Sequence, residues 1–379
     1  MAPVAVESQV LPTTIESLKD GISSVTVTES RSSSPEAPEF DLKAYSSFDN
    51  TPSIGTEFRE FAKDGKPVLD IRTVLADDTK LAALGRLVSE RGVVFFRNAQ
   101  ITPEEQLTLV DKLGKFGGKP DTSRLHVHPC TQEGQEEQEE ITIVSNKYVF
   151  GRSFKRNDND ILSRRPGAKE WHSDITFEPV PSDYASLVIR KLPEVGGDTL
   201  WASAYEAYDR LSPSYQRLLE GLSALHKGDG FIYLAKLAGL PLREGRGAPE
   251  NVGQDLEAIH PVVRTNPVTG WKGLFVNQNF TKHLLDTESG KRLPEAESEA
   301  ILTYLFALVE GNHDLQVRFR WEKDSLAIWD NRSTFHAATS DIDGGLREGT
   351  RSVSLGERPY FDPKSLTRRQ ALKKAAEDQ

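Results

Sequence analysis

The chain has 379 residues, 37% of them hydrophobic, which is enough for one large domain or two ordinary ones with a sizeable core. Its net charge of −10 disfavours nucleic acid and anionic membranes as partners, so an anionic substrate would need a local basic pocket. Cys130 is the only cysteine, which excludes an intrachain disulfide and a thiolate metal cluster.

The N-terminal segment, residues 1–45, is rich in Ser, Thr, Pro and Glu without apolar periodicity, which predicts disorder. It lacks the pattern of a secretory signal, and no apolar run in the chain approaches the roughly 20 residues of a membrane helix. We therefore expect a cytoplasmic protein. Residues 46–363 are predicted to form the folded domain, and the charged tail 364–379 a short exposed helix or a frayed end.

Helices and strands alternate irregularly within this domain. Apolar residues recur at helical spacing over 80–90, and the apolar run 93–96 predicts a buried strand. Thr102, Pro103 and Glu105 form the capping-box start of a helix that continues to Leu113. The later predicted elements are strands at 141–144 and 185–189, a helix at 212–219, a strand at 274–276, a helix at 297–309, and strands at 325–329 and 351–355.

The strands are short, and their connections vary in length without a regular βαβ alternation. This pattern favours an α+β, mainly-β fold, in which helices pack outside a β-sandwich or jelly roll. The acidic stretch 132–140 indicates a solvated loop rather than a metal site, because carboxylates without histidine hold transition metals poorly.

The motif Trp171-His172-Ser173-Asp174 is the first with metal-binding potential. In an extended segment, residues i and i+2 point to the same face, so His172 and Asp174 can present an imidazole and a carboxylate to one ion. One further histidine would complete the 2-His-1-carboxylate triad of oxygen-activating Fe(II) enzymes. The His-x-Asp pair alone is a weak signal, because it arises by chance in many chains.

A second motif, Trp329 to His336, follows the predicted strand 325–329. Downstream of it, Arg347 and Arg351 are four positions apart, so on an extended strand they lie on one face and can reach the same cavity as His336. Guanidinium groups suit the bidentate capture of carboxylate or sulfonate. For two arginines taken alone, exposed ion pairs remain the alternative.

Four blocks in order resemble the taurine/α-ketoglutarate dioxygenase family, and within it the fungal sulfonate dioxygenases. The resemblance covers about residues 93–361. The blocks are 171–177, 196–201, 260–270 together with 274–277, and 329–336, the last followed by arginines 11 and 15 residues after His336.

This resemblance implies a double-stranded β-helix (jelly-roll) core with flanking helices. It implies that His172, Asp174 and His336 ligate Fe(II), with 2-oxoglutarate and O2 as co-substrates. Arg347 would pair with the distal carboxylate of 2-oxoglutarate, and Thr199 would hydrogen-bond the same group. Oxidation would yield succinate and CO2 together with a hydroxylated product.

On the substrate side, the resemblance implies that Arg351 faces an anionic head and that His128 and Phe177 are further contacts. For His128, a histidine beside a proline, a structural role is an equal alternative. Thr131 and Ala168 stand where taurine dioxygenase carries contacts to the substrate amine, which argues against taurine itself. The expected substrate is a small anion: an organosulfonate first, giving sulfite and an aldehyde, or alternatively a carboxylate, amino acid or purine of specialised metabolism.

Two other classes stay open at this point. One is a non-catalytic β-sandwich binding protein with a vestigial iron site. The other is a zinc hydrolase that uses the same three ligands, but it leaves Arg347, Arg351 and Thr199 without a function. Homo-oligomerisation is left open, and the histidines outside the motifs, at 226, 260, 283 and 313, are predicted to be structural or surface residues.

Overall fold

The computed structural model describes residues 40–130, 139–146, 148–149, 154–155, 170–239, 241–342 and 345–378. Most of the predicted N-terminal segment lies outside them, as do residues 132–138 of the acidic stretch and the substrate-side positions Thr131 and Ala168. The folded part begins at least as early as Phe40, before the predicted boundary. A short 3₁₀ helix (η2, Leu42–Ala44) is capped by the Asp41 side chain, and Leu42 is buried.

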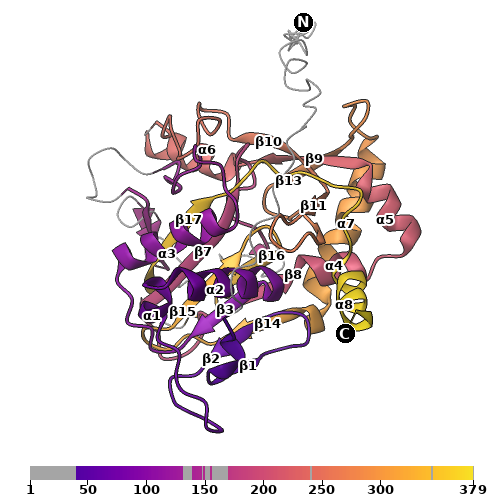
Figure 1. Ribbon diagram of the computed structural model, residues 1–379. Coiled ribbons are helices and arrows are strands. Elements are labelled where there is room, and N and C mark those ends of the chain that lie inside the picture. Colours follow the sequence, from indigo (N-terminus) through magenta and orange to yellow (C-terminus); the bar gives the residue numbers. More distant parts are fainter. Residues whose placement is uncertain are drawn as a thin grey trace, which may run out of the picture. The chain divides into compact units, whose positions relative to one another are not determined.

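The largest sheet has seven strands. Their spatial order is β1 (Ser47–Asp49), β2 (Thr56–Phe58), β3 (Val93–Phe96), β15 (Leu326–Asp330), β7 (Ser182–Lys191), β17 (Glu348–Leu355) and β4 (Ile141–Ser145). The neighbours are antiparallel except β2 and β3. The sheet therefore joins segments far apart in the sequence (Figure 1).

The helices α1 (Ile71–Leu75), α2 (Asp78–Arg91) and α3 (Pro103–Phe116) cover one face of this sheet (Figure 1). Strand β3 shows how its two faces differ, because alternate side chains point in opposite directions. Val94 and Phe96 pack with the helices, whereas Val93 and Phe95 belong to the core cluster on the other face.

A three-stranded antiparallel sheet contributes to that second core cluster. Its order is β14 (Gln316–Phe319), β8 (Thr199–Ser203) and β16 (Thr334–Ala338). Trp201 of β8 packs edge-on against Phe95, and Phe319 of β14 stacks on the same ring. The two sheets thus share an apolar core, as expected for strands with one inward face each.

The remaining described elements surround these sheets. A three-stranded sheet has the order β10 (Glu257–Pro261), β9 (Leu222–Lys227) and β13 (Thr281–Asp286). Two further sheets have two strands each: β5 (Tyr148–Val149) pairs with β6 (Phe154–Lys155), and β11 (Val263–Thr265) pairs with β12 (Lys272–Leu274). The helices are α4 (Ala204–Asp209), α5 (Pro213–Glu220), α6 (Asp229–Ala238), α7 (Glu295–Gly311), a 3₁₀ turn η5 (His313–Leu315) and α8 (Arg368–Glu377). Within the described ranges, no helix combines the length and apolar character needed to cross a bilayer.

Most predicted elements are confirmed. The predicted helices correspond to α2, α3, α5 and α7, and nearly all predicted strands correspond to β3, β4, β7, β15 and β17. The tail forms the exposed helix α8, which buries none of its residues. The predicted strand 274–276 is wrong beyond Leu274, because β12 ends there and the chain turns at Asn277, whose side chain accepts a hydrogen bond from the Phe280 N–H. The fold is therefore a mixture of helices and sheets, as the α+β prediction requires.

Candidate metal centre

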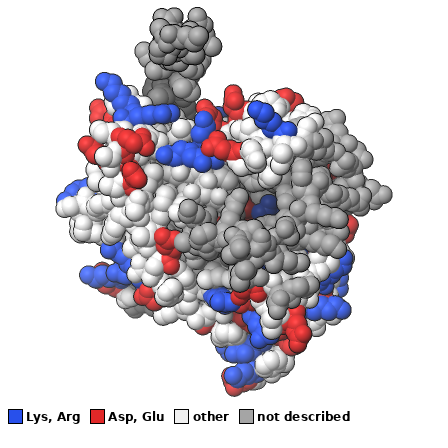
Figure 2. All heavy atoms as spheres, turned by 180° about the vertical axis from the view of Figure 1, so that it is seen from behind, with Lys and Arg blue, Asp and Glu red and all other residues white. Residues whose placement is uncertain are grey.

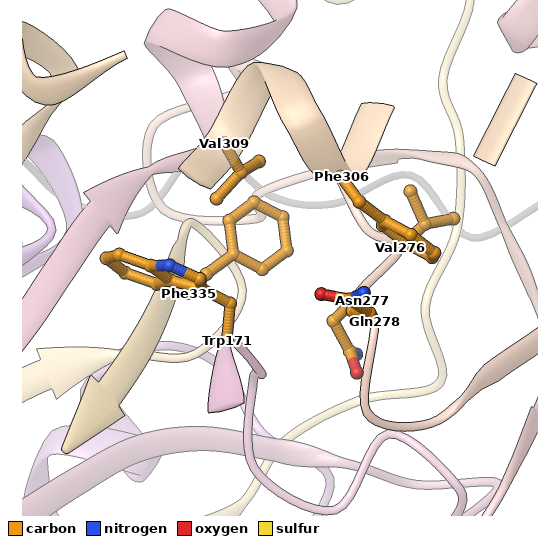
Figure 3. Close-up of a pocket in the computed structure, with 7 residues that line it drawn as sticks. All are labelled: Trp171, Val276, Asn277, Gln278, Phe306, Val309 and Phe335. Atoms are coloured by element: carbon orange, nitrogen blue, oxygen red, sulfur yellow. The ribbon is translucent and has the colours of Figure 1, made fainter. Parts of the chain in front are cut away.

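Two distant segments meet at His172 and His336. The His336 N–H donates to His172 O at 2.7 Å, and the His172 N–H donates to His336 O at 3.0 Å, which forms an antiparallel bridge. The two imidazole rings lie 4.2 Å apart between centroids. The preceding side chains, Trp171 and Phe335, point instead into a small apolar pocket beside α7 (Figure 3). Because successive side chains of an extended segment point to opposite sides, the two imidazoles lie on the side away from the pocket beside α7.

Asp174 completes the cluster. Its Oδ1 lies 4.0 Å from His172 Nε2 and 3.8 Å from His336 Nε2. The possible ligand atoms of the three residues all lie within 4.8 Å of one another. Two imidazoles and one carboxylate are the donor set of non-haem Fe(II) oxygenases, so these residues fit such an ion.

The tautomer and charge of the imidazoles suit metal binding. His172 Nδ1 lies 2.7 Å from Glu170 O, and because a carbonyl only accepts, Nδ1 carries the proton and Nε2 keeps its lone pair. Burial, and next the neighbouring His172, lower the pKa of His336 to about 3. His336 is therefore neutral around pH 7.

Asp174 is a buried carboxylate with two different oxygen environments. Oδ1 accepts a hydrogen bond from Arg351 Nη1 at 2.7 Å, and Oδ2 accepts one from Asn331 Nδ2 at 3.3 Å. Burial alone would raise the pKa of this carboxyl, but Arg351 and then the two histidines lower it to about 2. The group is thus ionised over the pH range in which it would bind a cation.

Arg347 and Thr199 lie together, as the sequence predicted. Arg347 is 5% exposed; its Nε donates to Gly197 O at 2.7 Å and its Nη2 to Thr199 Oγ1 at 3.1 Å. Gly197 has a φ of +72°, and a Cβ there would lie 2.8 Å from Arg347 Cδ, so glycine lets the two approach. Trp321, which the sequence did not single out, donates its Nε1–H to Thr199 Oγ1 at 3.0 Å.

Arg351 contacts one of the predicted metal ligands directly, which the sequence did not indicate. It lies on β17, and its Nη1 donates a hydrogen bond to Asp174 Oδ1. Its Nε is buried without a hydrogen-bond partner among the described residues. On the face shown in Figure 2, acidic and basic side chains are interspersed, and basic side-chain atoms are visible inside a central hollow.

His128 and Phe177 are both buried. The His128 ring packs edge-on against Phe231 of α6, 5.1 Å between centroids. Burial first, and then the neighbouring His126 and Arg351, lower the pKa of His128, which is consistent with its lying near the Arg351 side of the site.

Phe177 is fully buried behind Phe280, whose ring meets His172 edge-on at 5.9 Å. Phe231 and Phe280 were missed by the sequence reasoning. The only local signal for Phe280 is its place just after the block that ends at Asn277.

Comparisons with known proteins agree with this geometry. Residues 50–353 match the family model described as taurine catabolism dioxygenase TauD, TfdA family. The chain is 41% identical to the alpha-ketoglutarate-dependent dioxygenase btcD of Neocamarosporium betae, over 89% of this chain and 98% of that protein. It is 33% identical to the alpha-ketoglutarate-dependent sulfonate dioxygenase of Saccharomyces cerevisiae, over 83% of this chain and 68% of that protein. A crystal structure of a taurine dioxygenase from Burkholderia xenovorans, 24% identical, superposes with a TM-score of 0.59 over 84% of this chain and 93% of that one.

Proposed function

Because the chain belongs to the taurine catabolism dioxygenase TauD, TfdA family, we propose that it hydroxylates a small anionic substrate, with an organosulfonate as the first candidate class. It is an Fe(II)- and 2-oxoglutarate-dependent dioxygenase. When bound, iron and 2-oxoglutarate supply an O2-dependent oxidation that yields succinate, CO2 and a hydroxylated product. The binding-protein and zinc-hydrolase alternatives are set aside by family membership. We further infer that the two facing sheets are the halves of a jelly roll.

His172, Asp174 and His336 would hold the iron. The supporting observation is that two imidazoles and an ionised carboxylate bring their ligand atoms within 4.8 Å of one another. Three protein ligands leave three positions open on a six-coordinate ion, which suits a chelating co-substrate and O2. The His172 tautomer, fixed by Glu170 O, would hold that ring in its binding orientation.

Arg347 and Thr199 would bind the distal carboxylate of 2-oxoglutarate. Thr199 Oγ1 already accepts hydrogen bonds from Arg347 and from Trp321, so its own O–H remains as a donor. A guanidinium and a hydroxyl side by side in a buried position favour a carboxylate, which accepts from both. The Gly197 carbonyl would keep the guanidinium oriented while the co-substrate is absent.

Arg351 would bind the anionic head of the primary substrate, and its position carries this proposal. Its Nη1 lies 2.7 Å from the Asp174 oxygen nearest both histidines, so a bound anion would be close to the metal. A guanidinium has five N–H donors, and the bond to Asp174 uses only one of them. Hydroxylation at a carbon that bears a sulfonate would release sulfite and leave an aldehyde.

A carboxylate, amino acid or purine is the second candidate, and the aromatic side chains favour it. Phe280 contacts the His172 ring and Phe231 contacts the His128 ring, so a planar or apolar substrate body would find aromatic partners beside the metal. The 41% identical relative is named only as a dioxygenase, without a sulfonate.

The test is a succinate-release screen with Fe(II), 2-oxoglutarate and matched sulfonates, carboxylates, amino acids and purines. Sulfite is measured in parallel in every reaction. Sulfite released in step with succinate supports the first candidate. Succinate coupled to a carboxylate or purine, with no sulfonate producing sulfite, rejects it in favour of the second.

A further inference from the structure

Asn331, the central residue of the Asp330-Asn331-Arg332 run, contacts Asp174 through both ends of its amide. We propose that Asn331 is a positioning residue that makes Asp174 bind iron through Oδ1 alone. This inference rests on the proposed function of Asp174 as a metal ligand. Nothing in the sequence pattern predicted the contact, because the two residues are 157 positions apart.

The hydrogen-bond partners fix which way the amide of Asn331 points. Its Oδ1 faces the Asp174 backbone N–H at 3.0 Å and the Trp329 Nε1–H at 3.0 Å. Both groups can only donate, so the atom between them must be the amide oxygen. The Nδ2 group then donates to Ser182 Oγ at 2.9 Å and to Asp174 Oδ2 at 3.3 Å.

This orientation gives the two carboxylate oxygens different tasks. Oδ2 accepts from the amide of Asn331, while Oδ1, which also accepts from Arg351 Nη1, is the oxygen nearest both histidine Nε2 atoms. Two imidazoles and one carboxylate oxygen would leave the remaining positions of the ion free for the co-substrates. If Asp174 bound through both oxygens, it would occupy one of these positions. The hydrogen bond to Oδ2 disfavours that arrangement.

The backbone around Asn331 and Asp174 is held in place by its neighbours. The Asn331 N–H donates to Asp183 O at 2.8 Å, and the flanking Asp330 and Arg332 form a fully buried ion pair at 2.8 Å. On the other side, Ile175 follows Asp174 with a φ of +50°, which is strained for a β-branched residue. Such a conformation persists only where the surroundings over-determine it, as they do around Asp174.

The experiment is an anaerobic titration of the full chain with Fe(II), followed by 2-oxoglutarate. It compares wild type with Asn331→Ala and Ser182→Ala. For Asn331→Ala we expect the Fe(II) dissociation constant to rise about 10- to 100-fold, the usual effect of losing a group that orients a metal ligand. We also expect a changed visible absorption of the Fe(II)–2-oxoglutarate complex. Ser182→Ala removes only one anchor of the amide and should weaken binding in the same direction, about 2- to 10-fold.

A matched control is Asn251→Ala. Asn251 is equally buried and also uses both ends of its amide, to Val180 N–H at 2.9 Å and Val180 O at 2.8 Å, and neither partner belongs to Asp174. This variant should lose thermal stability while keeping the wild-type iron affinity and spectrum.

Wild-type affinity and an unchanged spectrum in Asn331→Ala, or in Ser182→Ala should the first variant not fold, would overturn the positioning role. An equal loss in Asn251→Ala would reduce the effect to general destabilisation and overturn it as well. If Asp174→Ala binds iron as tightly as wild type, the proposed function of Asp174 fails, and the inference fails with it.

Discussion

Replacing Arg347 should weaken 2-oxoglutarate binding much more than binding of the primary substrate. The guanidinium is 5% exposed and already oriented by Gly197 O and Thr199 Oγ1, so it reaches a carboxylate with little further cost. Truncating one partner of a buried, hydrogen-bonded charge pair costs about 2–5 kcal/mol. Arg347→Ala should therefore raise the apparent dissociation constant for 2-oxoglutarate by about 30- to 4,000-fold at 1.4 kcal/mol per decade. Arg347→Lys keeps the positive charge but not the two parallel N–H donors of the guanidinium, so its loss of affinity for 2-oxoglutarate should be intermediate.

The measurement is anaerobic calorimetric titration of the iron-loaded protein with 2-oxoglutarate. Arg318 provides a matched control, because it lies on β14, the strand paired with β8 that carries Thr199, and pairs with Asp198 at 2.7 Å. Its own side chain is 55% exposed although Asp198 is buried, so solvent screens its charge and Arg318→Ala should change the affinity less than about fivefold. The reasoning is refuted if Arg347→Ala binds 2-oxoglutarate normally, or if Arg347→Ala and Arg318→Ala lose affinity equally.

Two further predictions concern the same site, and a third concerns Asp183, a buried carboxyl group on β7. Asp174→Ala should abolish turnover even at saturating Fe(II) while circular dichroism stays native; retained activity would remove Asp174 from the ligand set. Arg351→Ala should raise the KM of the preferred anion about 30-fold or more with 2-oxoglutarate affinity altered less than about fivefold, and the reverse pattern would exchange the two arginine roles. Burial raises the pKa of Asp183 to about 6, above the roughly 4 of an unfolded chain, so its contribution to stability is present in acid and lost as pH rises from about 4 to 6. The thermal midpoint of Asp183→Asn, measured relative to that of wild type, should therefore rise between pH 4 and pH 7. A difference between the two midpoints that does not change with pH would contradict the burial argument.

Local signals predicted the secondary structure well where the chain itself encodes the boundary. Thr102 and Glu105 form the reciprocal capping box that their spacing indicated, and α3 begins at Pro103, directly after Thr102. The prediction for 274–276 was wrong because an apolar run does not reveal where a turn begins. The Asn277 side chain favours a turn by accepting a hydrogen bond from the Phe280 N–H, a signal that hydrophobic patterning does not contain.

The metal cluster was predictable because two of its members are neighbours in sequence. His172 and Asp174 lie on one face of an extended segment, and the family resemblance supplied His336 together with the offsets of Arg347 and Arg351. The proximity of Arg347 to Thr199 agrees with that resemblance. The contact between Arg351 and Asp174 could not be predicted, because it depends on how the fold places β17 beside a segment 177 positions earlier in the chain.

That contact changes how the site should be understood. One oxygen of Asp174 is shared by the prospective metal and by the guanidinium that is proposed to hold the substrate, while the other is held by Asn331. A cation bound at Oδ1 would withdraw electron density from the oxygen that accepts the Arg351 hydrogen bond and would repel the guanidinium, so it would weaken that bond. An anion should therefore bind Arg351 with a more favourable free energy in the metal-bound protein than in the metal-free protein. Because Asp174 joins both groups, metal binding and substrate binding are expected to favour each other through this single carboxylate, with Asn331 keeping it in place.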